Sequence, residues 1–131
     1  MAGELILVVE DHEKNRKLVR DVLQFKGYRT LESESAEEGI RLAQAHRPAL
    51  ILMDISLPGM NGITALSRLR ADPVTRGIPV IAVTASAMTQ DRQTILAAGF
   101  DGYQSKPIDV KGFLEAVRRV LARPVDARDD S

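Results

Sequence analysis

Four short runs that predict strands each lead to a charged or reactive side chain. They are ILVVED, LILMD, VIAVT and YQSKP, and they reach Asp11, Asp54, Thr84 and Lys106, respectively. Apolar runs without alternation are typical of strands covered on both faces, as in a parallel sheet. Because the carboxyl ends of parallel strands share one edge, residues far apart in the sequence meet in one crevice there. We therefore expect these four residues, together with Glu10, to form one site.

Amphipathic segments with helical spacing separate these runs. We predict strands at about residues 4–9, 29–33, 50–54, 79–85 and 102–105, and helices at about 13–26, 35–46, 63–71, 87–98 and 109–122. Ser35 and Glu38 match the S-x-x-E capping box at the start of the second helix, and Gly27 stands where the first helix ends. This alternation predicts an α/β fold, a doubly wound five-stranded parallel sheet with helices on both faces.

The composition fits one domain and restricts the classes of function. Among 131 residues, 44% are hydrophobic, so we expect one core over residues 1–122, and the polar segment 123–131 predicts a disordered tail. Basic and acidic residues both total 18, so no net charge favours nucleic acid or an anionic membrane as a partner. The chain has no cysteine and no apolar segment that predicts a membrane span or signal peptide, which favours a cytoplasmic protein.

A cluster of Glu10, Asp11 and Asp54 needs a cation. Two unit charges about 4 Å apart repel by about 4 kcal/mol at an effective dielectric constant of about 20. Oxygen-only ligands, with no cysteine and no histidine at the strand ends, favour Mg²⁺, with Asp11 and Asp54 as direct ligands and Glu10 acting through water. Each acid also has a structural interpretation, because Asp54 could cap a helix and the pair could favour the start of the next helix.

A carboxylate beside Mg²⁺ can act as a nucleophile and form an aspartyl phosphate. Asp54 is then the acceptor, Thr84 can donate a hydrogen bond to a phosphoryl oxygen, and Lys106 can pair with the same group. Thr84 could instead cap the following helix, and Lys106 could be a solvated surface lysine. We interpret His12 and His46 as surface residues.

Five motifs in this order resemble the response-regulator receiver domain of two-component phosphorelay signalling, over about residues 5–122. They are the acidic pair Glu10-Asp11, Asp54 with its LPGMNG loop, Thr84 before a small residue, Tyr103, and Lys106 before a proline. The resemblance implies a flavodoxin-like fold with strand order 2-1-3-4-5. It also implies that Asp54 is phosphorylated by a phosphohistidine of a histidine kinase or a histidine phosphotransfer protein.

Further roles follow from the resemblance alone. It implies that Glu10 and Asp11 organise Mg²⁺ and that the backbone carbonyl of Ser56 completes the metal site. It implies that Tyr103 is the switch aromatic and that the Lys106-Pro107 peptide is cis. The donor is expected to dock around residues 15–16 and the loop at residue 107.

The opening DHEKNRKLVRDVL is similar to single-domain regulators of the DivK type, which bind kinases and other signalling proteins. We therefore expect a phosphoacceptor rather than an enzyme. This phosphoacceptor would take its phosphoryl group from a donor and would dephosphorylate itself. It would be a monomer or a weak phosphorylation-dependent dimer that binds a downstream signalling protein and has no DNA-binding output. A receiver module of a hybrid histidine kinase would have the same motifs.

Two further classes of protein could use a similar sheet or similar chemistry. An aspartyl-phosphate phosphohydrolase of the haloacid-dehalogenase type would have an Asp-x-Asp pair after the first strand, where this chain has Glu-Asp-His-Glu. A nucleotide- or flavin-binding module would have a glycine-rich phosphate loop at that position, which is absent from the sequence. The residues after the first strand therefore favour the receiver domain over both classes.

Overall fold

Strands and helices alternate throughout the part of the chain that is described. The structure is a computed structural model, and it describes residues 3–55, 59–84, 89–106 and 108–122. The strands are β1 (Leu5–Val9), β2 (Arg29–Ser33), β3 (Leu50–Asp54), β4 (Val80–Thr84) and β5 (Gly102–Ser105). The helices are α1 (Glu13–Phe25), α2 (Ala36–His46), α3 (Gly62–Ala71), α4 (Thr89–Ala97) and α5 (Val110–Leu121).

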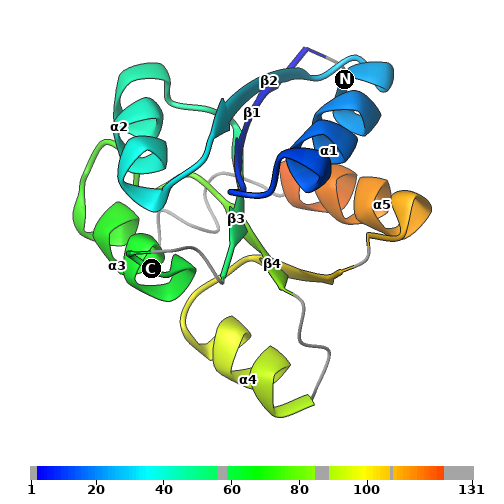
Figure 1. The fold of residues 1–131 in the computed structure, drawn as a ribbon. Helices are drawn as coiled ribbons and strands as arrows, with labels where there is room; N and C mark the ends of the chain where they lie inside the picture. Colours follow the sequence, from blue (N-terminus) through cyan, green and yellow to red (C-terminus); the bar gives the residue numbers. More distant parts are fainter. Residues whose placement is uncertain (1–2, 56–58, 85–88, 107, 123–131) are drawn as a thin grey trace.

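All strand pairs are parallel, in the order β2-β1-β3-β4-β5. Helices α1 and α5 lie together on one side of this sheet, and α2 and α3 lie on the other (Figure 1). This architecture confirms the doubly wound five-stranded sheet and the strand order 2-1-3-4-5. Its consequence is that Glu10, Asp54, Thr84 and Lys106 stand at or just beyond the carboxyl ends of four strands.

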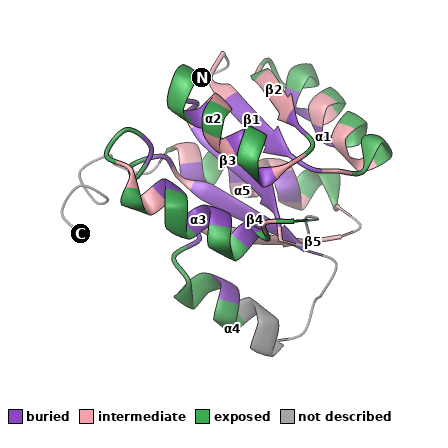
Figure 2. Cartoon of the chain, turned by 60° about the vertical axis from the view of Figure 1, so that its left-hand side comes forward, coloured by how far each residue is buried: buried purple, intermediate pink, exposed green. Residues whose placement is uncertain are grey.

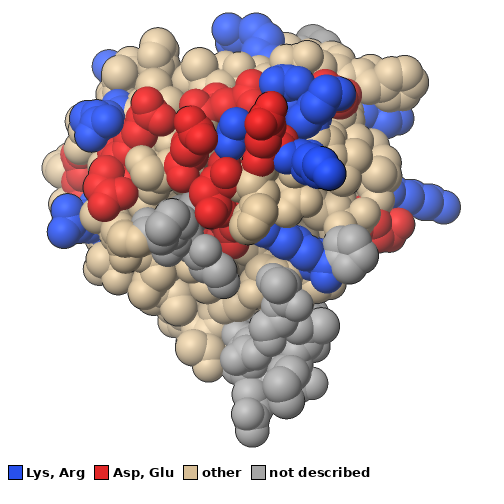
Figure 3. Space-filling view, viewed as in Figure 1, with Lys and Arg blue, Asp and Glu red and all other residues tan. Residues whose placement is uncertain are grey.

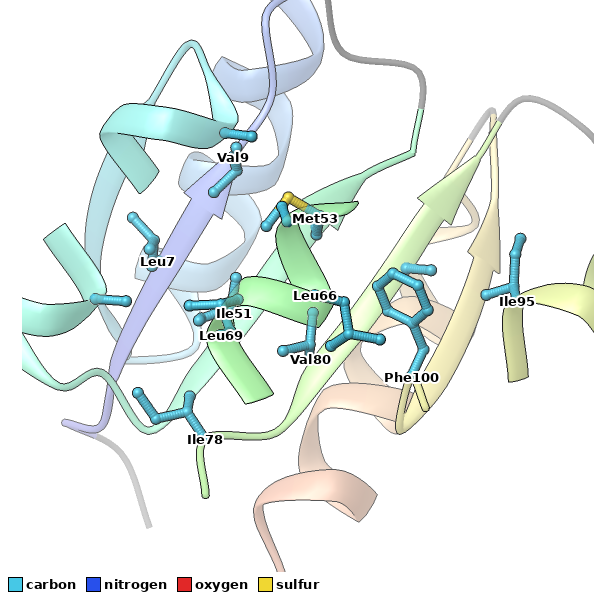
Figure 4. Packing of buried hydrophobic residues seen from close by; sticks show 14 residues of the cluster. Leu7, Val9, Ile51, Met53, Leu66, Leu69, Ile78, Val80, Ile95 and Phe100 are labelled. Atoms are coloured by element: carbon cyan, nitrogen blue, oxygen red, sulfur yellow. The ribbon is translucent and has the colours of Figure 1, made fainter. Parts of the chain in front are cut away.

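Alternate residues of the central strands pack into two separate cores. On one face, Leu7, Ile51 and Val80 pack with residues of α2, α3 and α4 (Figure 4). On the other face, Ile6, Leu52 and other strand residues pack with residues of α1 and α5. Every residue of β3 and β4 is therefore buried, while the outer surfaces of the helices are exposed (Figure 2). The site lies at the ends of strands that packing fixes on both faces.

Two predicted signals, Ser35 and Gly27, lie at the ends of helices. The side-chain oxygen of Ser35 caps α2 by accepting a hydrogen bond from the backbone N–H of Glu38, at 3.2 Å. The backbone N–H of Ser35 itself donates to the hydroxyl of Ser33 at 3.3 Å. Gly27 follows the end of α1 with a φ of 92°, a conformation that glycine adopts readily.

Some predictions fall outside the described residues. These are the last residue of the predicted strand 79–85, the first two residues of the predicted helix 87–98, and the tail 123–131. Within the residues that are described, no helix has the length and apolar character needed to cross a membrane.

Candidate functional site

The ammonium group of Lys106 joins two buried carboxylates that are distant in the sequence. Its Nζ lies 2.9 Å from Glu10 Oε1 and 3.0 Å from Asp54 Oδ2. Glu10 follows β1, Asp54 ends β3 and Lys106 follows β5, so the order of strands in the sheet brings the three together. The side chains of Glu10 and Asp54 are only 6% and 3% exposed. An otherwise unfavourable pair of buried negative charges thus shares one positive partner.

Both ends of this contact have shifted pKa values. Burial raises the pKa of Glu10 above its usual value, although the hydrogen bonds from Lys106 and from the backbone of His12 oppose this shift. Burial alone would lower the pKa of Lys106, but its hydrogen bonds to Glu10 and Asp54 outweigh burial and raise that pKa. Lys106 therefore keeps its charge at neutral pH.

Asp11 has a carboxylate oxygen that suits a cation. Asp11 Oδ1 is buried and accepts no hydrogen bond. One ligand atom each of Glu10, Asp11 and His12 lie within 4.8 Å of one another. The other oxygen of Glu10, Oε2, accepts a hydrogen bond from the backbone N–H of His12 at 3.1 Å. This donor set fits a divalent cation, because a buried carboxylate oxygen without a donor needs a positive partner.

Thr84 lies beside the same group of residues. It ends β4, its residue is 4% exposed, and its backbone carbonyl accepts a hydrogen bond from the backbone N–H of Lys106 at 2.7 Å. This bond fixes the start of the Lys106 side chain next to the end of β4. The predicted contact of the Thr84 hydroxyl with a phosphoryl group stays a prediction.

Tyr103 lies in β5, opposite Ala82 of β4. It is partly buried and packs against the core on the α2, α3 and α4 side of the sheet. It also lines a surface hollow of about 510 Å³ between α4 and α5, together with Leu96, Ala116 and Arg119. Tyr103 thus connects the interior of the sheet to a surface formed by α4, β5 and α5.

Arg16 has a structural role that the sequence does not predict. Its guanidinium donates to the backbone carbonyl of Glu10 at 3.0 Å, and it pairs with Glu32 at 3.4 Å and with Glu34 at 3.9 Å. The Arg16 side chain is 15% exposed. It therefore links the end of β1 to the end of β2. The signal that could have revealed this role is an arginine in the first turns of a helix that begins directly after an acidic strand end.

Gly62 begins α3 against the end of β3, whereas the sequence predicts it only as part of a turn-rich loop. Its backbone N–H donates to the carbonyl of Ile55 at 3.1 Å. The side chain of Asn61 caps the same helix by accepting from the N–H of Thr64 at 2.9 Å. These bonds hold the start of α3 close to the end of β3.

Charged side chains are unevenly distributed over the surface. Figure 3 shows aspartate and glutamate side chains gathered in a band on one face, with lysine and arginine side chains beside them.

Ser56 and Pro107 lie outside the described residues, so the predicted metal-binding carbonyl of Ser56 and the predicted cis peptide before Pro107 stay predictions.

Three comparisons relate this geometry to known proteins. The model of the response regulator receiver domain family matches residues 6–118. The chain is 45% identical over 116 residues to the polar-differentiation response regulator DivK of Brucella anthropi, covering 88% of this chain and 94% of that protein. DivK of Brucella ovis has the same identity and coverage.

Solved structures agree with these sequence matches. The receiver domain of a sensor histidine kinase from Pseudomonas aeruginosa, which has a magnesium ion coordinated in its active site cleft, is 34% identical with a TM-score of 0.85. That match covers 93% of this chain and 100% of the other. A response regulator from Chloroflexus aurantiacus is 27% identical with a TM-score of 0.88, covering 92% of this chain and 99% of the other.

Proposed function

This chain belongs to the response-regulator receiver family of two-component signalling, and we propose that it is a phosphoacceptor switch in which Asp54 is the phosphorylated residue. The observation that carries this proposal is the buried carboxylate of Asp54 beside the ammonium group of Lys106, 3.0 Å away. The chain is a signalling protein and not an enzyme in the usual sense. In this proposal the phosphoryl group comes from a phosphohistidine of a histidine kinase or a histidine phosphotransfer protein.

The chemistry requires a nucleophile, a charge partner and a cation. A carboxylate oxygen of Asp54 attacks the phosphorus, the P–N bond of the donor phosphohistidine breaks, and the imidazole leaves with the electron pair of that bond. Asp11 and Asp54 would bind Mg²⁺ directly, with Glu10 acting through water and the carbonyl of Ser56 as a further ligand. Bound Mg²⁺ neutralises charge on the phosphoryl group and on the acceptor.

Lys106 is placed to exchange partners during this transfer. In the unphosphorylated protein it contacts Asp54, while its second contact, with Glu10, holds the ammonium group at the site. A phosphoryl group adds about 1.5 to 2 negative charges at neutral pH. Lys106 then pairs with a phosphoryl oxygen, and the hydroxyl of Thr84 donates to another.

These new bonds supply the free energy of the switch. Hydrogen bonds to charged groups contribute about 1.5–3 kcal/mol each, so two approach the roughly 5.5 kcal/mol that moves an equilibrium from 1:99 to 99:1. Thr84 moves toward the phosphoryl group, and Tyr103 rotates into the space that it leaves. The hollow between α4 and α5, which Tyr103 lines, then changes shape.

The similarity to the response regulator DivK supports a signalling role, and in this proposal the output is protein binding in the cytoplasm rather than DNA binding. In this proposal the phosphorylated chain binds a downstream signalling protein as a monomer or a weak dimer. The similarity to the receiver domain of a sensor histidine kinase supports the second candidate, a receiver module of a hybrid kinase. Both candidates share the chemistry at Asp54.

Intact-mass measurement after incubation with an acyl phosphate and Mg²⁺ tests the proposal. We expect the wild type to gain one phosphoryl group and Asp54→Asn to gain none. Asp21→Asn is a matched control, because Asp21 lies on the exposed surface of α1. Equal phosphorylation of Asp54→Asn and the wild type would exclude Asp54 as the acceptor. Continuous release of phosphate from varied esters would favour a phosphohydrolase instead.

A further inference from the structure

We propose that His12 is a ligand of the cation bound beside Asp11, so that this site prefers metals that accept a nitrogen ligand more strongly than an all-oxygen site would. This role rests on the metal site of the proposed function and adds a residue to it. The sequence alone indicates only a surface histidine at this position. The His12 side chain is 71% exposed, but it lies against both carboxylates of the acidic pair.

The distances are close to those of a shared metal ion. His12 Nδ1 lies 3.4 Å from Asp11 Oδ1 and 3.5 Å from Glu10 Oε2. Two adjacent ligands of an octahedral ion, with bonds of about 2.1 Å, lie about 3.0 Å apart. A small rotation of the exposed ring brings Nδ1 into that range.

The backbone around His12 already has a fixed geometry. His12 stands at the N-cap position of α1, but its side chain makes no capping hydrogen bond. Its backbone N–H donates a hydrogen bond to Glu10 Oε2 at 3.1 Å, and the guanidinium of Arg16 donates one to the backbone carbonyl of Glu10 at 3.0 Å. The helix start is therefore positioned by backbone contacts, and the imidazole is directed to the acids rather than to the helix.

Asp11 supplies the independent reason to expect a cation at this point. Its Oδ1 atom is buried and accepts no hydrogen bond, although Nδ1 of His12 is 3.4 Å away. A metal ion between these two atoms gives the oxygen its positive partner and gives the neutral imidazole a bond to its lone pair. Imidazole suits Co²⁺, Ni²⁺ and Zn²⁺ better than it suits Mg²⁺, which prefers oxygen.

Calorimetric titration with Co²⁺ and Mg²⁺ tests this role. We expect His12→Asn to weaken Co²⁺ binding by at least about tenfold, the scale for residues that support a metal site, and to change Mg²⁺ binding by less than about twofold. His46→Asn is the matched control, because His46 is the other histidine of the chain and lies at the end of α2. A second readout is NMR, where Co²⁺ should shift or broaden the ring signals of His12 before those of His46.

Three results would overturn the role of His12 or the function on which it rests. Equal changes in Co²⁺ and Mg²⁺ affinity would mean that His12 is no ligand. Tighter binding of both ions by His12→Asn would mean that the imidazole is only an ion-pair partner of the acids and competes with the metal. In both cases Asp54 can still be phosphorylated with Mg²⁺, so the proposed function stands. Coordination by His12 without any phosphorylation of Asp54 would instead remove the proposed function.

Discussion

The backbone carbonyl oxygen of Asp54 occupies the position that a side chain on Gly62 would need. A Cβ atom at position 62 would lie 2.8 Å from that oxygen and 2.9 Å from the Cα of Ile55. Both neighbours are backbone atoms at the end of β3, so neither can rotate away. The start of α3 and the position of Asp54 are therefore coupled by direct contact.

Gly62→Ala should displace Asp54 from its place beside Lys106. We expect a loss of about 1–3 kcal/mol in the free energy of unfolding, the usual effect of overpacking, and slower phosphorylation by an acyl phosphate. Gly77→Ala is the control, because a Cβ there meets nothing within 4 Å. Urea unfolding measures the stability, and intact mass measures the phosphorylation. Wild-type stability and phosphorylation of Gly62→Ala would show that the end of β3 can shift to make room for the added Cβ.

Lys106→Met should leave Glu10 and Asp54 buried without their shared positive partner. Removal of one member of a buried ion pair destabilises a protein by about 3 kcal/mol or more, and phosphorylation should also be lost. Lys111→Met removes an exposed lysine of α5 and should change neither property. Urea unfolding in the presence of a metal chelator checks the first effect, and a fully stable Lys106→Met would argue against the ion-pair account.

Arg16→Leu should loosen the connection between the ends of β1 and β2. The variant loses one hydrogen bond to the Glu10 carbonyl and the ion pairs with Glu32 and Glu34, and the Arg16 side chain is only 15% exposed. We therefore expect destabilisation by about 2 kcal/mol and weaker Mg²⁺ binding. Lys17→Leu is the matched control on the next residue, because its pair with Asp21 is 65% and 50% exposed and such pairs contribute under about 1 kcal/mol. Similar losses from both variants would contradict a specific role for Arg16.

Asp72 should contribute stability that depends on pH. Hydrogen bonds from the backbone N–H of Val74 and then from the side chain of Gln44 hold the pKa of Asp72 below its usual value. The folded state therefore favours the charged form, and its contribution is present above the pKa of the unfolded chain and is lost as the pH falls through the folded pKa. The difference in unfolding free energy between wild type and Asp72→Asn should be constant above about pH 5. It should shrink as the pH falls below about 4 and through the folded pKa. A difference that persists at low pH would refute this linkage.

The convergence of Glu10, Asp54 and Lys106 can be predicted from the sequence, because the carboxyl ends of parallel strands share one edge. The strand order comes from the family resemblance, since periodicity does not fix which strands are neighbours. The role of Gly62 cannot be predicted, because it depends on how closely α3 approaches β3. For Arg16 the sequence offers only its place in the first turns of the helix after the acidic pair, since its contact with β2 depends on how closely that strand approaches α1. The sequence indicates correctly that His12 is exposed, but local sequence does not report the direction of its ring.

The edge position of β5 has a consequence for how this protein can diversify. β5 pairs with β4 on one side only, and its four residues are all partly buried, whereas β3 and β4 are fully buried. Substitutions of partly buried side chains at this edge leave the fully buried strands β3 and β4 in place. The surface around Tyr103 can therefore vary in shape and charge among relatives of this sequence, while Asp54 keeps its place at the end of a buried strand.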